Sequence, residues 1–121
     1  MLHNRDIFYI EQMLYYSHEA LSFFAELNQS EEEFLKSKLY KNAISKSIEQ
    51  IGEQLSEGRL SDEVKEKYAF IPWRLIKDFR NLAVHEYGRV DWTEVVSLLK
   101  TELNQLNTDL EYVLHDLKKK K

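Results

Sequence analysis

The sequence predicts an all-α protein, an antiparallel helical bundle of four long helices plus one short helix. Three glycines and one proline in 121 residues leave few positions at which a helix must end. Apolar residues recur every three or four positions over long stretches, which is the spacing of the buried stripe of an amphipathic helix. No segment alternates apolar and polar residues as a half-buried strand does. We therefore expect a single helical domain over residues 1–121.

The first two helices are predicted from apolar stripes and boundary residues. The stripe of the first helix consists of Ile7, Ile10, Leu14, Ser17, Leu21 and Phe24. The second helix is expected to begin at Ser30, because Glu33 three residues later completes a capping box, and to end at Gly58. Its inward-facing residues are Ile44, Ile48, Ile51 and Leu55.

Three further helices are expected in the second half of the chain. A short one covers residues 61–68. The next begins at Pro72, which suits a first helical turn because its missing N–H would be unpaired there, and it ends at Gly88. The last begins at Asp91, with Glu94 in the capping position, and is about 40 Å long. Its stripe keeps a three-four step: Val96, Leu99, Leu103, Leu106, Leu110, Val113 and Leu117.

Composition excludes several classes of protein. The chain has no cysteine, which excludes disulfides, thiolate zinc sites and a thiol nucleophile. His3, His18 and His115 are scattered without metal-ligand spacing, so we expect no metal and no cofactor. No apolar run reaches the roughly 18 residues that a membrane span needs, and the first residues lack the apolar core of a signal peptide. We therefore expect a cytoplasmic protein without membrane contact.

The stretch FRNLAVHEYG, residues 79–88, carries the candidate functional residues. On a regular helix with about 100° per residue, Arg80 and Tyr87 lie within about 20° of each other, and Asn81 and His85 share another side. Arg80 and His85 are then about 140° apart. Either the helix loosens before Gly88, or a second chain completes the site.

A second apolar surface on the same helix favours the alternative in which a second chain completes the site. Trp73 and Val84 lie on one flank, turned away from the expected core stripe centred near Phe79.

The charge of this region is also unusual. The whole chain has a net charge of −4. Residues 74–89, in contrast, hold a local excess of basic groups, which are Arg74, Lys77, Arg80 and Arg89 against Asp78 and Glu86.

Arginine and histidine together suit RNA cleavage without a metal ion. The reaction needs a base for the 2′-hydroxyl proton, an acid for the leaving 5′-oxygen, and fixed positive charge on the phosphorane-like transition state. Histidine, with an ordinary pKa of about 6.5, suits the first two roles, and arginine suits the third. One chain offers His85 for one role. A two-fold dimer formed through Trp73 and Val84 would place two histidines and two arginines in one cleft.

At these residues the sequence resembles the HepT-like toxins, ribonucleases of the HEPN superfamily. Their signature is an arginine, four residues, a histidine, one residue and a tyrosine, which here are Arg80, His85 and Tyr87. The segments NAISKSIEQIGEQLS and IPWRLIKDFRNLAVHEYGRVDW extend the resemblance, which is strongest from Asn42 to Trp92.

The resemblance implies a HEPN-like helical homodimer, the toxin of a toxin–antitoxin system, with a composite RNA-cleaving site that uses no metal. Arg80 and His85 are the implied catalytic residues, with Asn81 in support, and tRNA and mRNA are the candidate substrates. The implied partner is a minimal nucleotidyltransferase antitoxin, which in the family can add AMP to the tyrosine that here is Tyr87.

Another hypothesis belongs to a different class of protein. The chain could be a non-catalytic helical nucleotide-binding module that docks a nucleotidyltransferase, with Arg80 and His85 on a nucleotide phosphate. A purely structural bundle is a third interpretation, and it leaves the polar cluster before Gly88 unexplained.

For two other features we prefer a structural interpretation to a functional one. Gly52 and Glu53 let two helices approach closely, and the lysines between Lys36 and Lys46 form a solvated face.

Overall fold

The computed structural model describes the backbone of residues 2–119 and the side chains of residues 4–119. Its helices are α1 (Leu2–Glu26), α2 (Glu31–Lys36), α3 (Lys38–Glu53), α4 (Asp62–Lys67), α5 (Trp73–His85), α6 (Trp92–Ser97) and α7 (Leu103–Lys119). A 3₁₀ turn, η1 (Tyr87–Arg89), follows α5, and a π turn, η2 (Leu98–Glu102), joins α6 to α7. The described residues contain no strand, and the predicted all-α fold is confirmed.

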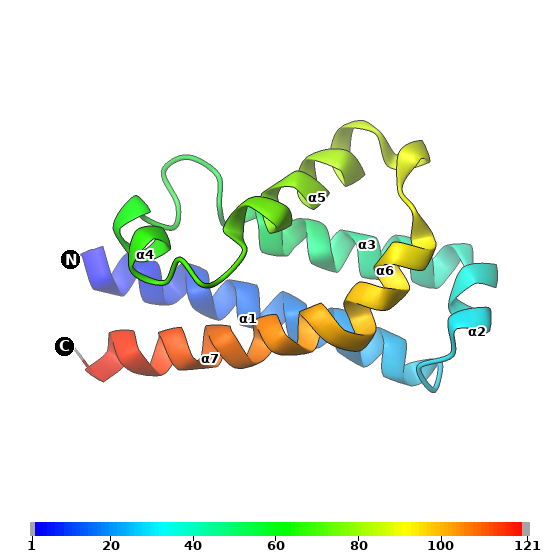
Figure 1. Cartoon of the computed structure of the whole chain (residues 1–121), viewed down its shortest axis with the longest axis horizontal. Coiled ribbons are helices and arrows are strands. Elements are labelled where there is room, and N and C mark those ends of the chain that lie inside the picture. Colours follow the sequence, from blue (N-terminus) through cyan, green and yellow to red (C-terminus); the bar gives the residue numbers. More distant parts are fainter. Residues whose placement is uncertain (1, 120–121) are drawn as a thin grey trace.

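The long helices run antiparallel in chain order, as expected for an up-down bundle. Figure 1 shows α1 and α7 side by side with the two chain ends at the same end of the molecule. The helix α3 packs against α1, and α5 lies on α3, opposite the spine formed by α1 and α7. The helix α5 and the η1 turn after it are therefore carried on the outside of the bundle.

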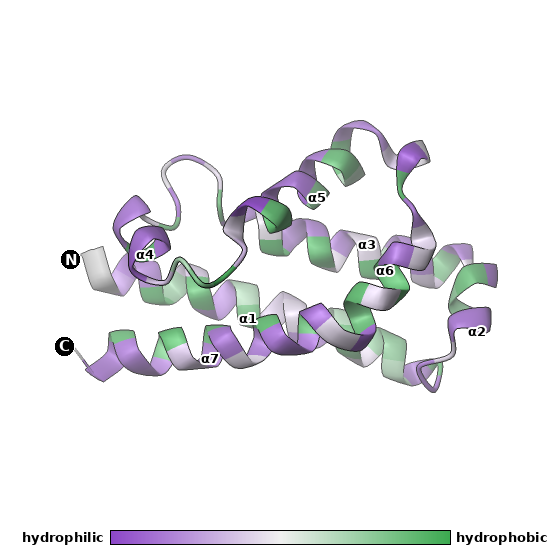
Figure 2. Cartoon of the chain, viewed as in Figure 1, coloured by the Kyte–Doolittle hydropathy of each residue, from purple (hydrophilic) through white to green (hydrophobic). Residues whose placement is uncertain are grey.

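The core is built from the predicted stripes. Every stripe residue expected for the last helix is buried, and so are those expected for the second, while Leu21 in the first stripe is half-buried. Figure 2 shows hydrophobic bands along α1, α3 and α7 that alternate with hydrophilic ones, as the amphipathic pattern requires. Buried polar side chains add cross-links. Ser17 Oγ donates to Asn107 Oδ1 over 2.7 Å, and the buried Asp6 carboxylate accepts from the backbone and side chain of Ser61.

The second predicted helix is in fact two helices. Ser37 adopts an extended conformation, its N–H donates to Phe34 O, and its hydroxyl accepts from Tyr40 N over 3.1 Å. A single serine thus ends α2 and caps α3. The Ser30 cap is present as predicted, since Ser30 Oγ accepts from Glu33 N over 3.1 Å. The last predicted helix is continuous, but it passes through the π turn at residues 98–102.

Two predicted helix ends are too late. The helix α3 ends at Glu53 instead of Gly58, because Gly58 lies in the following loop with a φ of +85°, a conformation that favours glycine. The helix α5 ends at His85 instead of Gly88, because Glu86 leaves the helical conformation with φ −141° and ψ 52°. Residues 86–90 therefore do not continue the helical geometry that the sequence suggested.

A close approach between α3 and α5 determines the position of α5 on the bundle. A Cβ placed on Gly52 would lie 2.4 Å from Arg80 Cβ and 3.1 Å from the carbonyl oxygen of Ile76. A side chain at this position would therefore push the helices apart, and the expected spacer role of Gly52 is confirmed. The side of α5 that faces α3 includes Arg80 and the buried Ala83, whereas Leu75 is 68% exposed. Of the expected core stripe centred near Phe79, Ile76, Phe79 and Leu82 pack against the core and Ala83 is buried, whereas Leu75 does not join them.

Candidate functional site

Arg80 is held at the contact between α3 and α5. Its Nη2 donates to Glu53 Oε2 over 2.8 Å, and its Nη1 donates to Asn81 Oδ1 over 3.0 Å. The Arg80 and Glu53 side chains are 26% and 30% exposed. The buried Nε has no hydrogen-bond partner among the described residues. The guanidinium is therefore fixed in orientation by two neighbours but still reaches the surface.

Glu53 was not predicted as a site residue. The sequence places it 27 residues before Arg80, where no helical spacing connects the two. The available signal was the glycine before it, because a glycine inside a helix marks a place where another backbone can approach. An acid next to such a glycine and a basic residue on the opposing helix make a good candidate pair.

His85 is the last residue of α5 and is exposed. Within the described residues its imidazole takes no part in a hydrogen bond or an ion pair, so both ring nitrogens are available to a ligand. It follows Asn81 by four positions, which places the two about 40° apart around the helix. Arg80 is about 140° from His85, with its guanidinium directed toward α3. The structure thus brings Arg80 and Asn81 together but does not bring His85 onto Arg80.

Tyr87 lies outside α5, in the η1 turn. Its hydroxyl donates to Asn42 Oδ1 of α3, and its ring lies 5.4 Å from the Trp92 ring in an edge-on arrangement. Partial burial raises the pKa of the Tyr87 phenol above its ordinary value, so the proton is harder to remove than that of a free phenol. The residue is nevertheless 41% exposed.

Tyr87 does not lie next to Arg80, as the sequence had led us to expect. Helical geometry would have set them within about 20° on one flank, but α5 ends before Tyr87. Their partners on α3, Asn42 and Glu53, are eleven residues apart, which is about 16 Å along a helix. The phenol and the guanidinium of one chain therefore reach opposite ends of α3.

Trp73 and Val84, the two residues expected at a dimer interface, differ in their contacts and in their exposure to solvent. The Trp73 indole N–H donates to the carbonyl oxygens of Lys65 and Tyr68 over 3.0 and 3.2 Å, so this half-buried ring fastens α5 to the segment around α4. Val84 is 42% exposed on the same flank. Of the two residues predicted to face a partner, Val84 is the one that presents its side chain to solvent.

Two depressions flank α5, and their chemistry differs. The apolar groove, about 340 Å³, lies between α5 and the helices α6 and α7 and includes Leu75, Phe79 and Leu82. Carboxylates stand along its edge, which are those of Asp91, Glu94 and Glu102. The basic hollow, about 380 Å³, lies on the Trp73 side of α5. It is lined by Leu55, Lys65, Trp73, Arg74, Lys77, Asp78 and Asn81.

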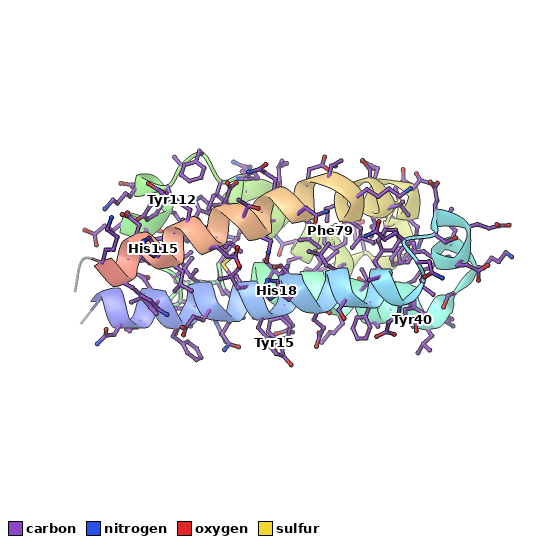
Figure 3. The ribbon with its side chains drawn as sticks, turned by 90° about the horizontal axis from the view of Figure 1, so that it is seen from below. Tyr15, His18, Tyr40, Phe79, Tyr112 and His115 are labelled. Atoms are coloured by element: carbon purple, nitrogen blue, oxygen red, sulfur yellow. The ribbon has the colours of Figure 1, made fainter. Side chains whose placement is uncertain are left out.

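The remaining histidines and charged residues form no second cluster. His18 on α1 and His115 on α7 lie at separate places in the bundle, as Figure 3 shows, and the His3 side chain is outside the described residues. Among the described side chains, no group of three or more histidine or acidic residues is placed to hold a metal ion. None of the helices within residues 2–119 has the length and apolarity needed to cross a membrane. Lys36 and Lys46 are exposed and form ion pairs with Glu32 and Glu49.

Comparison with known proteins places this chain among ribonucleases. The family model described as "Ribonuclease HepT-like" matches residues 13–113. A protein of Methanocaldococcus jannaschii named "Putative RNase MJ0125" is 28% identical over 112 residues, which are 93% of each chain. "Putative RNase TTE0752" of Caldanaerobacter subterraneus subsp. tengcongensis is 29% identical over 83 residues, 69% of this chain and 72% of its own. No solved structure gives a significant match.

Proposed function

The chain belongs to the HepT-like ribonuclease family, and we propose that it is a metal-independent endoribonuclease in which Arg80 and His85 act on the scissile phosphate of RNA. The observation that carries the proposal is the restrained guanidinium of Arg80. Glu53 and Asn81 hold it at the surface, where it can bond phosphate oxygens, and the exposed His85 lies at the end of the same helix.

The reaction we propose uses the RNA as its own nucleophile. A neutral imidazole removes the proton of the 2′-hydroxyl, and the 2′-oxygen attacks the adjacent phosphorus. The bond from phosphorus to the 5′-oxygen breaks as that oxygen takes a proton from an imidazolium. The products are a 2′,3′-cyclic phosphate and a 5′-hydroxyl. Arg80 stabilises the negative charge on the equatorial oxygens, which is greatest in the transition state.

Two copies of the chain complete this site. One chain has one His85, and about 140° around α5 separates that residue from Arg80, so a single chain does not direct both at one phosphate. A dimer formed through the flank that carries Val84 sets the α5 helices against each other. Each guanidinium then lies near the histidine of the other copy, and the two histidines serve as base and acid. Trp73 supports this flank from within its own chain.

The biological role that we propose is the toxin of a toxin–antitoxin system, with tRNA or mRNA as substrate. The partner is a minimal nucleotidyltransferase antitoxin that adds AMP to Tyr87. In support, the Tyr87 hydroxyl is on the surface and is oriented by Asn42. The phenol gives up its proton during the attack on the α-phosphate of ATP, and the antitoxin must supply the base, because burial makes this proton harder to remove than that of a free phenol. Pyrophosphate leaves, and the tyrosine carries AMP.

The first prediction concerns the catalytic residues. His85→Ala and Arg80→Ala should each lower RNA cleavage by roughly 10²- to 10⁴-fold, because one removes an acid–base group and the other removes charge stabilisation. Cleavage by the wild type should continue in chelator and should produce 2′,3′-cyclic phosphate ends, measured on a defined oligonucleotide.

Two controls make this experiment decisive. Circular dichroism should show that both variants remain helical. A substrate with one 2′-deoxy sugar at the cut site should not be cut there. Undiminished cleavage by folded His85→Ala, or cleavage at the deoxy position, would contradict the mechanism. Nucleotide binding without any cleavage by the wild type would favour the non-catalytic module instead.

The second prediction concerns the dimer. Val84→Glu should sediment as a monomer and lose cleavage, because the carboxylate would be buried at the interface without a partner. Leu75→Glu is a matched control, since Leu75 is also exposed but lies about 180° away around α5. It should remain dimeric and active. A dimeric Val84→Glu together with a monomeric Leu75→Glu would assign the interface to the apolar groove and refute the proposed one.

The third prediction concerns Tyr87. Incubation with the antitoxin and ATP should raise the intact mass of the wild type by one or more AMP units and suppress cleavage. Tyr87→Phe keeps the ring against Trp92 but removes the acceptor oxygen. It should keep much of the cleavage activity, gain no AMP and stay active. An equal mass increase on both proteins would show that the acceptor is a different residue.

A further inference from the structure

The basic hollow beside α5 has a charge opposite to that of the whole molecule. Its lining holds three cationic side chains, Lys65, Arg74 and Lys77, and one carboxylate, Asp78. This local excess of two positive charges stands out in a chain whose net charge is −4. A concave surface with an excess of one sign of charge attracts ligands of the opposite sign. The hollow therefore suits an anion.

The basic hollow is continuous with the proposed catalytic cation. Asn81, which lines the hollow, accepts a hydrogen bond from Arg80 Nη1. The Asn81 amide nitrogen makes no hydrogen bond within the described residues, so its two N–H groups remain available. Lys77 precedes Arg80 by three residues, which is a rise of about 4.5 Å along α5. A phosphate in the hollow would thus lie next to one held by Arg80.

The cations of the hollow are available to a ligand. Arg74 meets Asp78 at 4.0 Å, but the two side chains are 92% and 62% exposed. Lys65 lies 3.5 Å from the exposed carboxylate of Asp62. Such surface pairs are weak, and a phosphate can replace them at little cost. Lys77 is exposed and forms no ion pair with the described residues.

The apolar groove on the other side of α5 is the poorer route for RNA. Its apolar lining offers no cation to phosphate, and the carboxylates of Asp91, Glu94 and Glu102 stand at its edge. These three negative charges repel an RNA backbone. On the hollow side, the lining supplies cationic side chains and the Asn81 amide instead.

We propose that the basic hollow is a phosphate subsite, in which Arg74, Lys77 and Asn81 bind the RNA backbone adjacent to the scissile phosphate at Arg80. This inference rests on the proposed ribonuclease function. The contacts are made to the backbone and not to base edges. They add affinity and set the position of the strand without reading its sequence.

The salt dependence of RNA binding tests the subsite. The parent protein is His85→Ala, which binds a labelled single-stranded RNA without cutting it. Dissociation constants are measured between 50 and 200 mM salt for the parent and for the parent carrying Arg74→Gln and Lys77→Gln. Each lost phosphate contact should lower the slope of log K against log salt by about 0.7, so the double change should lower it by about 1.4.

A matched control removes the same charge elsewhere. Lys36→Gln with Lys100→Gln neutralises one exposed lysine that is paired with a neighbouring acid and one that forms no ion pair with the described residues, both outside the hollow. The control should keep the parent slope. With His85 intact, the hollow variant should raise KM and leave kcat largely unchanged, because its contacts are the same in the ground state and the transition state.

The possible results separate the subsite from the function. An unchanged slope for the hollow variant, with RNA still bound by the parent, would overturn the subsite alone. The same decrease in the control would show that binding depends on diffuse charge, and it would also overturn the subsite. A parent that binds no RNA, together with a wild type that cuts none, would overturn the proposed function and the subsite with it.

Discussion

The contact between α3 and α5 at Gly52 is the constraint on which the candidate site depends. The absence of a side chain at Gly52 lets Arg80 Cβ approach the α3 backbone, and the next residue, Glu53, meets the guanidinium. This contact fixes how α5 is rotated on the bundle. The same rotation turns Leu75 toward the apolar groove, Lys77 toward the basic hollow and His85 toward solvent. The arrangement of charge around α5 thus follows from one missing side chain.

The ion pair between Glu53 and Arg80 acts on orientation more than on stability. The two side chains are only 26% and 30% exposed, and the cost of removing their charges from water offsets much of their attraction. Their geometry has the larger consequence. Because Glu53 and Asn81 hold one edge of the guanidinium, the Arg80 side chain loses less conformational freedom when phosphate binds. We therefore propose that Glu53 is a positioning residue, which acts on RNA through Arg80.

The sequence was sufficient to predict the helical class and the core, and the site only in part. Buried stripes such as that from Val96 to Leu117 follow a local period, which a single sequence displays directly. The break at Ser37 was missed because one serine both ends α2 and caps α3, without glycine or proline as a signal. Glu53 was missed because its partner is distant in sequence. Tyr87 was placed next to Arg80 by assuming a regular helix up to Gly88, although the helix ends at His85.

The most direct test of the account is cleavage of RNA by Glu53→Gln, with Glu49→Gln as a control that removes another carboxylate of α3, one paired with Lys46 instead of Arg80. We expect Glu53→Gln to remain a folded dimer and to lose roughly 10- to 100-fold in kcat, because a small displacement of a catalytic group has effects of that size. In an Arg80→Ala background the same change should have no further effect, because the two residues act as a unit. Glu49→Gln should cleave as the wild type does. Wild-type or faster cleavage by Glu53→Gln would contradict the claim that the α3–α5 contact positions Arg80 for catalysis.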